Sequence, residues 1–127
     1  ILNLEASSSF SDVSKDDWSY YYISSAFNVG IINGINDQEF GKEKEITRQE
    51  MAVMLNRTLK HLEKSLPKNN TLVNFKDAES ISDYAVDAIE ALYEAGIMTG
   101  VGDDMFAPTS IATRAMAAKI VKMSLDL

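Results

Sequence analysis

The chain contains an internal repeat, and this repeat constrains its fold more than any other feature of the sequence. From Trp18 and Tyr84 onward the second copy follows the first at a constant offset of 66 residues; before that point the offset is 65. The matched segments are Phe10-Ser11-Asp12-Val13 with Phe75-Lys76-Asp77-Ala78, Gly30-Ile31-Ile32-Asn33-Gly34 with Gly96-Ile97-Met98-Thr99-Gly100, Asp37 and Phe40 with Asp103 and Phe106, and Thr47-Arg48 with Thr113-Arg114. Repeats of this length are supersecondary units that bury a shared core by stacking.

Composition indicates a globular domain and excludes several classes of function. The chain has 127 residues, of which 46% are apolar, and none of its apolar runs approaches the ~18 residues that a membrane span needs. Cysteine is absent, which excludes disulfides, thiol catalysis and cysteine-ligated metals. The net charge is −7 and the basic residues are scattered. We therefore expect neither nucleic-acid binding nor membrane insertion.

Each repeat is predicted to begin with an amphipathic helix that ends at a glycine. In the first repeat Asp16 or Asp17 is the expected N-cap of a helix through Val29, and in the second repeat Ser82 is the expected cap. The expected apolar faces are Trp18, Tyr22, Ile23, Ala26 and Phe27 in the first helix, and Tyr84, Ala88, Ile89, Leu92 and Tyr93 in the second. Gly30 and Gly96, each followed by isoleucine, are typical of a Schellman stop.

A compact loop and a second helix follow in each repeat. We expect Gly34 and Gly100 to adopt backbone angles that other residues resist, and Phe40 and Phe106 to fold back into the core. Thr47-Arg48-Gln49-Glu50 is predicted to be a capping box that opens a helix ending at Pro67. The apolar stripe expected on that helix is Met51, Leu55, Leu59, Leu62 and Leu66. At Thr113 the box glutamate is replaced by Met116, so only the threonine half is expected there.

The predicted fold is all-α, with helix-loop-helix repeats packed as part of a three-repeat pseudo-symmetric prism. Residues 1–9 are interpreted as the tail of a preceding repeat, 10–66 as repeat one, 67–74 as a linker and 75–127 as repeat two, together forming one domain.

In its motifs the sequence resembles the S-layer homology modules of bacterial cell-surface proteins. The resemblance rests on Phe10-Ser11-Asp12-Val13, Trp18, Gly30-Ile31-Ile32-Asn33-Gly34, Asp37, Phe40 and Ile46-Thr47-Arg48-Gln49-Glu50, and it recurs in the second repeat. It implies a secreted module of the bacterial cell wall or S-layer that binds secondary cell-wall polysaccharide carrying an anionic, pyruvylated sugar. It also implies pockets between neighbouring repeats.

The resemblance implies a set of ligand-binding positions in each repeat. These are Arg48, Trp18, Asp12 and Gly34 in the first repeat, and Arg114, Tyr84, Asp77 and Gly100 in the second. The second repeat departs from the family pattern at Met116, Tyr84 and Ala78, and the first has Gln49 where alanine is usual. Two repeats also fall short of the usual three. We therefore expect binding to depend on Arg48 more than on Arg114, and expect the chain to self-associate or to be completed by a further repeat in trans.

Several of these residues also have a purely structural interpretation. Thr47, Glu50 and Thr113 are explained by capping alone, and Trp18 by its place on the expected apolar face. Arg48 has no role in capping, and its planar fork suits carboxylate recognition; a salt bridge to a neighbouring acidic residue is the alternative. At Tyr20, Tyr21 and Tyr22 three consecutive aromatics cannot all point inward, so at least one is expected to be exposed.

The sequence provides no motif for catalysis, a metal or a cofactor. His61 has no second histidine or cysteine as a partner, and the acidic loops at Asn36-Asp37 and Asp103-Asp104 do not fit the EF-hand pattern. We therefore expect a non-catalytic anchoring module. The alternative is a protein–protein assembly module of a bacterial surface layer. The first predicts that Arg48 stands free in a groove beside an aromatic ring; the second predicts an open apolar face.

Overall fold

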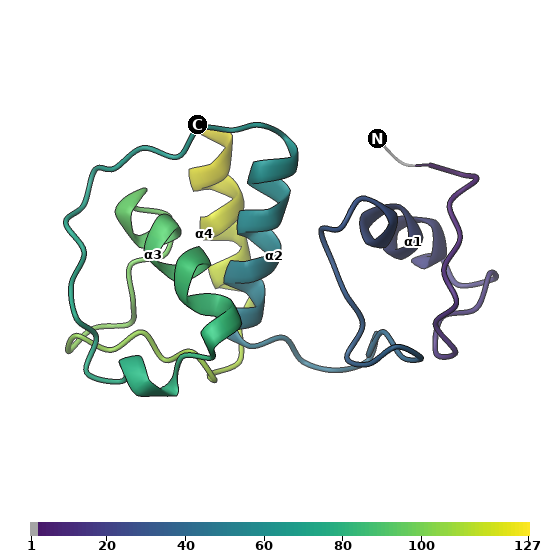
Figure 1. Cartoon of the computed structure of the whole chain (residues 1–127), viewed down its shortest axis with the longest axis horizontal. Coiled ribbons are helices and arrows are strands. Elements are labelled where there is room, and N and C mark those ends of the chain that lie inside the picture. Colours follow the sequence, from purple (N-terminus) through teal and green to yellow (C-terminus); the bar gives the residue numbers. More distant parts are fainter. Residues whose placement is uncertain (1–2) are drawn as a thin grey trace. The chain divides into compact units, whose positions relative to one another are not determined.

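The computed structural model describes residues 3–127, which form α-helices and short 3-10 helices joined by loops (Figure 1). The elements are α1 (Tyr20–Asn28), α2 (Arg48–His61), the 3-10 helices η1 (Ala78–Ser80) and η2 (Asp83–Ala85), α3 (Val86–Glu94) and α4 (Arg114–Leu125). Within residues 3–127 the only β-pairing consists of isolated bridges, Thr47 with Ile111 and Gly102 with Met105. The expected all-α class is confirmed. No helix of this described part combines the length and apolarity needed to cross a bilayer.

The chain forms two compact units whose boundary does not follow the sequence repeats. An N-terminal unit ends at Lys44 and contains α1, and a C-terminal unit runs from Glu45 to Leu127. Although α2 belongs to repeat one, it packs against α3 and η2 of repeat two. The main core therefore lies in the C-terminal unit; its buried members are Ala52, Val53, Leu59, Ala85, Ala88, Ile89, Leu92, Ala95, Ile97, Met98, Phe106 and Ile120.

Both predicted glycine stops are confirmed. Gly30 and Gly96 have φ values of 78° and 77°, the left-handed region that favours glycine. After α1, Ile31 N donates to Ala26 O at 3.0 Å, and after α3, Ile97 N donates to Leu92 O at 2.9 Å. With the second bond from each glycine, to Phe27 O and Tyr93 O, this is the Schellman pattern.

The predicted helix starts are wrong in both repeats. The α-helix α1 begins only at Tyr20, and its N-cap Ser19 makes no side-chain capping bond. Asp17 instead accepts from Ser14 N and from Lys42 Nζ, so its carboxylate ties a turn to a distant loop. Ser82 precedes the 3-10 turn η2 and does not cap it with its side chain either.

The late helix starts also change which aromatic residues are buried. Trp18, expected on the apolar face, lies before α1 and is 86% exposed, while its repeat equivalent Tyr84 lies in η2 and is 58% exposed. Tyr22 is exposed as well, and Tyr20 is buried in its place. The expectation that not all three tyrosines point inward is confirmed, but the face assigned to Trp18 and Tyr22 was wrong because the helix does not extend back to Trp18.

The capping box at the start of α2 is confirmed, but the predicted end of the helix is wrong. Glu50 N donates to Thr47 Oγ1 at 3.3 Å, and Thr47 N donates to Glu50 Oε2 at 2.9 Å. The helix ends at His61, with Leu62 as C-cap and Glu63 at φ 54°. Because Glu63 N and Lys64 N donate to Lys60 O and Leu59 O, a Schellman stop forms there without glycine. Leu62 and Leu66 therefore lie beyond the helix.

Two smaller expectations need correction. At the start of α4, Thr113 Oγ1 accepts from Met116 N at 3.2 Å, and Thr113 N also reaches Met116 Sδ at 3.5 Å. The reciprocal half is thus present, with a weakly accepting sulfur in place of a carboxylate. In the N-terminal segment Ile1 and Leu2 lie outside the described residues, and Leu4 lies in a turn closed by Ala6 N and Asn3 O instead of in a helix.

The two loop glycines are required for different reasons. Gly100 has φ 98°, as expected, whereas Gly34 does not have a positive φ. A Cβ at Gly34 would lie 2.4 Å from Glu39 O and 2.6 Å from Phe10 Cε1. Gly34 is therefore needed for space, because its loop folds back directly on an aromatic ring.

Candidate functional site

Each repeat contains an aspartate that holds the backbone of its core phenylalanine loop. Asp77 accepts from Phe106 N at 3.0 Å and from Ala107 N at 2.8 Å. Asp12 accepts in the same way from Phe40 N at 2.8 Å and from Gly41 N at 2.7 Å. The bond from Phe40 N is the main cause that lowers the pKa of Asp12. These carboxylates therefore have defined structural tasks.

Arg48 is buried where α2 meets repeat two. Its side chain is on the first turn of α2, and the residue is only 5% exposed. Nε donates to Phe106 O at 2.9 Å, and Cζ lies 4.8 Å from the centroid of the Phe106 ring. The expectation of an aromatic neighbour is met, but a freely standing Arg48 is wrong, because repeat two closes over it.

The charge of Arg48 has no direct counter-ion. Among residues 3–127 no carboxylate forms an ion pair with its guanidinium; Nη1 contacts Met116 Sδ at 3.6 Å. Desolvation lowers the pKa of the Arg48 guanidinium, and the charge of Asp77 raises it by a smaller effect. Within the described part no hydrogen bond is formed by Nη2, the remaining guanidinium nitrogen.

The first amides of α2 are bonded to the loop of repeat two. Arg48 N donates to Ser110 O at 2.8 Å and Gln49 N to Pro108 O at 3.0 Å. A free helix N-terminus attracts anions, but these carbonyls and the capping box already occupy the N–H groups of α2. The guanidinium, and not the helix end, is therefore the cationic group available at this junction.

Gln49, a departure from the family pattern, has a role at this junction that the sequence did not predict. Its buried amide pairs twice with Ser82: Nε2 donates to Ser82 Oγ at 3.1 Å and Oε1 accepts from Ser82 N at 2.9 Å. The exposed ring of Tyr84 follows two residues later on η2, which packs on α2. The signal that could have revealed this pairing was glutamine at a position where the family pattern has alanine.

The C-terminal unit contains five of the expected residues, and Arg48 and Asp77 lie close enough for the charge of Asp77 to act on Arg48. The five are Arg48, Asp77, Tyr84, Gly100 and Arg114. The N-terminal unit contains Asp12, Trp18 and Gly34, where the ring of Trp18 packs at 6.2 Å, centroid to centroid, against that of Tyr22. Arg114, the equivalent of Arg48, is exposed on the first turn of α4. No group of three or more His, Asp or Glu side chains within residues 3–127 is arranged to hold a metal ion.

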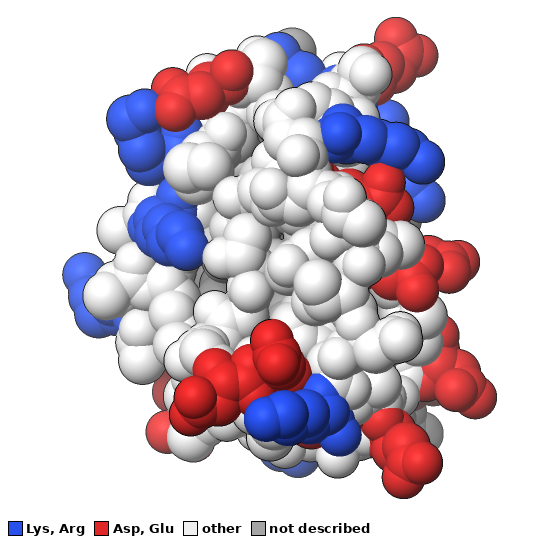
Figure 2. Space-filling view, turned by 90° about the vertical axis from the view of Figure 1, so that its left-hand side faces the viewer, with Lys and Arg blue, Asp and Glu red and all other residues white. Residues whose placement is uncertain are grey.

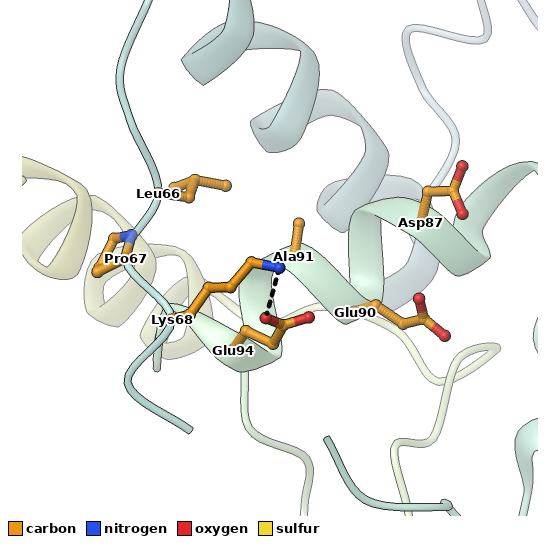
Figure 3. Close-up of a pocket in the computed structure, with 7 residues that line it drawn as sticks. All are labelled: Leu66, Pro67, Lys68, Asp87, Glu90, Ala91 and Glu94. Atoms are coloured by element: carbon orange, nitrogen blue, oxygen red, sulfur yellow. Dashed lines mark ion pairs between the residues drawn. The ribbon is translucent and has the colours of Figure 1, made fainter. Parts of the chain in front are cut away.

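A cleft of about 190 Å³ lies between α3 and the segment after α2, and its charge opposes an anionic ligand (Figure 3). Asp87, Glu90 and Glu94 of α3 line it, and Lys68 pairs with Glu94 at 3.5 Å. Three carboxylates against one ammonium would repel an acidic sugar. Figure 2 shows that, on the face it presents, charged side chains of both signs surround a largely uncharged centre.

A second cleft, of about 290 Å³, separates the C-terminal halves of α2 and α4 and is mainly apolar. Its lining residues are Leu55, Thr58, Leu59, Leu62, Lys64, Val121, Ser124 and Leu125. Leu62, Val121 and Leu125 are exposed. Apolar side chains are therefore exposed along this cleft of the C-terminal unit.

Comparison with known proteins finds the same repeat elsewhere. A family model described as the S-layer homology domain matches residues 9–52 and 74–118. The chain is 36% identical to an endoglucanase of Bacillus sp. (strain KSM-635), over 94% of this chain and 13% of that protein. It is 31% identical to a cell surface protein of Thermoanaerobacter kivui, over 98% and 16%, and 27% identical to a cellulosome-anchoring protein of Acetivibrio thermocellus, over 95% and 27%.

The chain therefore spans only about an eighth to a quarter of the length of these relatives. What they share with it is a module, attached in one case to an enzyme and in the others to surface or anchoring proteins. The two family matches fall on the two halves of the internal repeat, and the capped helices, glycine stops and aspartate-held loops recur in both. The chain belongs to the S-layer homology domain family, whose members are found in bacterial cell-surface proteins.

Proposed function

We propose that this chain is a non-catalytic module that anchors a protein to the bacterial cell wall by binding secondary cell-wall polysaccharide with a pyruvylated sugar. Membership of the family and similarity to a cellulosome-anchoring protein support anchoring. The observation that carries the finer proposal is Arg48, a buried cation without an ion pair within residues 3–127. A buried charge without a partner is costly, and the carboxylate of a pyruvate ketal would supply the missing charge.

The surroundings of Arg48 suit a sugar acid. Its Nη2 has no hydrogen-bond partner among the described residues, and a guanidinium binds carboxylates through parallel N–H donors. Tyr84, exposed on the adjacent η2, offers an aromatic face with a hydroxyl group. In this proposal Arg48 binds the carboxylate, and Tyr84 packs on the ring of the sugar. Asp77 and Gly100 support the loop that holds Phe106 beneath the arginine.

The test is retention of purified module on cell walls that contain or lack the secondary polysaccharide. Arg48→Lys keeps the charge and loses the planar fork, so we expect at least tenfold weaker retention. Arg114→Lys is the matched control, on the equivalent first turn, and should retain wild-type binding. Removing the pyruvate ketal by mild acid should abolish the difference between the two variants.

Because Arg48 is buried, its variant must be shown to be folded by circular dichroism. Tyr84→Ser, at an exposed position, provides an independent variant that leaves the core untouched and is expected to weaken binding. Wild-type retention by folded Arg48→Lys, together with wild-type retention by Tyr84→Ser, would contradict the proposed site. Equal retention on walls without the polysaccharide would contradict the proposed ligand.

The apolar cleft between α2 and α4 favours assembly with another protein as a second candidate function. Exposed leucines and a valine line this cleft, which is typical of an interface and not of a sugar site. Leu125→Asp should leave polysaccharide retention unchanged and abolish assembly if the cleft serves this purpose.

A further inference from the structure

The second helix of repeat one, α2, packs on the first half of repeat two and forms a junction with it. The surfaces that would form a second junction of this kind, on α4 and on the first half of repeat one, are exposed. In the junction that exists, the N-terminal part of α2 lies on the first half of repeat two, and it buries Arg48, Gln49, Ala52, Val53 and Asn56. The equivalent positions on α4 are Arg114, Ala115, Ala118, Lys119 and Lys122, and all of them are exposed. The face of α4 that corresponds to the buried face of α2 therefore has no partner within the described chain.

The hydrogen-bonding groups at the N-terminal end of this open face of α4 are also free, whereas Lys122 pairs with Asp126. Arg48 N and Gln49 N donate to repeat two in the existing junction. Their equivalents Arg114 N and Ala115 N have no partner among residues 3–127, nor does the Arg114 side chain. The next free amide of α4, Met116 N, donates to its cap Thr113. The unpaired groups are therefore the ones whose equivalents on α2 bond to repeat two.

The matching acceptors are open in the N-terminal unit. The carbonyls that receive α2 belong to Phe106, Pro108 and Ser110, whose repeat equivalents are Phe40, Lys42 and Lys44. In the part that the structure describes, none of these three carbonyls accepts a hydrogen bond. The loop that carries them is held by Asp12 just as Asp77 holds the loop of repeat two.

The apolar surface around these carbonyls is open as well. Leu92, Ala88 and Phe106 are fully buried in repeat two, where α2 covers them. Their equivalents are Ala26 and Phe40, which are partly exposed, and Tyr22, which is exposed. The residues that a docked helix would bury are thus the ones left accessible in repeat one.

The net charges of α4 and of residues 1–44 have opposite signs, which favours this pairing. The open α4 carries Arg114, Lys119 and Lys122, of which Lys122 already pairs with Asp126. Residues 1–44 contain seven acidic and three basic residues, and two of those basic residues, Lys42 and Lys44, belong to the loop that would receive α4. Opposite charges on two faces steer their encounter and suppress wrong pairings. Lys119 and Lys122, which replace Val53 and Asn56 of α2, suit an acidic partner better than a closed core.

We propose that the exposed face of α4 docks onto the N-terminal unit of a second copy of this chain, in the way that α2 docks onto repeat two. The contact is heterologous: each copy offers two different surfaces, the face of α4 and the surface of residues 10–44, so copies join head to tail. Docking would place Arg114 against Phe40 O, beside Asp12, in the setting that Arg48 has within one chain. This self-recognition goes beyond anchoring and does not depend on a glycan.

Sedimentation velocity over a range of concentrations tests the proposal on the full chain. We expect mass to increase with concentration for the wild type, and the monomer alone for Ala118→Arg, which places a bulky cation at the centre of the face. Ala78→Arg makes the same charge change at an exposed alanine outside the face and should associate like the wild type. Circular dichroism should show that both variants remain folded.

Cross-linking identifies which faces meet. Since the chain has no cysteine, Asp16→Cys and Ala115→Cys in one chain, equivalent to the Ser82–Gln49 pair, are its only thiols. A short bismaleimide should link separate copies and give dimers and higher species. A monomer at every concentration would overturn the proposal. A link formed only within one chain would overturn it too, because α4 would then close on its own N-terminal unit.

Discussion

At the scale of single residues, identical residues of the two repeats have different surroundings, because a helix packs on the first half of repeat two and none packs in the same way on repeat one. Arg48 and Arg114 occupy the same position in their repeats, yet the first is buried against Phe106 and the second is exposed. The sequence predicted both arginines correctly as first-turn residues. It could not predict their burial, since the partner of Arg48 is a carbonyl 58 residues further along the chain.

Asp12 gives a prediction for pH dependence. Its pKa in the folded chain is lowered, chiefly by the bond from Phe40 N, so folding favours the ionised carboxylate. The resulting stability is fully present above its ordinary pKa of about 3.9 and is lost as the pH falls through the lower, folded-state pKa. Asp12→Asn should therefore make the free energy of unfolding depend less on pH in the acidic range. Urea titrations of both proteins between neutral and acidic pH would show this, and parallel acid limbs would contradict it.

The two threonine caps provide a matched pair of variants. Thr47 sits in a box closed by a carboxylate, whereas at Thr113 the reciprocal acceptor is the sulfur of Met116. Loss of an N-cap typically costs about 1 kcal/mol. We expect Thr47→Ala to lower the free energy of unfolding by about that amount and Thr113→Ala by less. Equal shifts in chemical denaturation would show that the glutamate adds nothing to the cap.

At the scale of helices, the ends set by local signals were predictable and those set by context were not. Gly30 and Gly96 end α1 and α3 as predicted, because the left-handed backbone conformation at these ends depends on the glycine itself and not on distant contacts. The end of α2 was misplaced because Glu63 adopts the left-handed conformation without a sequence signal for it. The starts of α1 and α3 were misplaced because aspartate and serine near them bond elsewhere, to Lys42 and Gln49.

The stop of α2 makes a prediction of its own. A residue other than glycine in the left-handed region costs about 1 kcal/mol, and Glu63 occupies it at φ 54°. Glu63→Gly should raise the free energy of unfolding by up to about that amount, less the greater entropy that glycine has in the unfolded chain. Glu63→Ala removes the same carboxylate without freeing the backbone and is the control. Equal stability of the two variants would show that α2 does not end under strain.

At the scale of the whole molecule, the unequal distribution of the core predicts unequal stability. All members of the main buried cluster belong to the C-terminal unit, while the N-terminal unit buries Ala6, Phe10, Val13, Tyr20, Ile23 and Ile32. Local opening costs least where buried apolar contacts are few. The repeat alone would have predicted two equal halves; the difference arises because α2 of repeat one is incorporated into the core of repeat two.

Hydrogen exchange followed by mass spectrometry measures this difference directly. Amides of α1 should exchange at least tenfold faster than those of α2, a difference of about 1.4 kcal/mol in opening free energy. The measurement should use dilute protein, since docking of a second copy would cover the N-terminal unit and slow its exchange. Raising the concentration should then protect α1 in the wild type and leave it unprotected in Ala118→Arg. Equal protection of α1 and α2 in dilute wild-type protein would instead mean that the two units open together, and that α1 needs no partner to be stable.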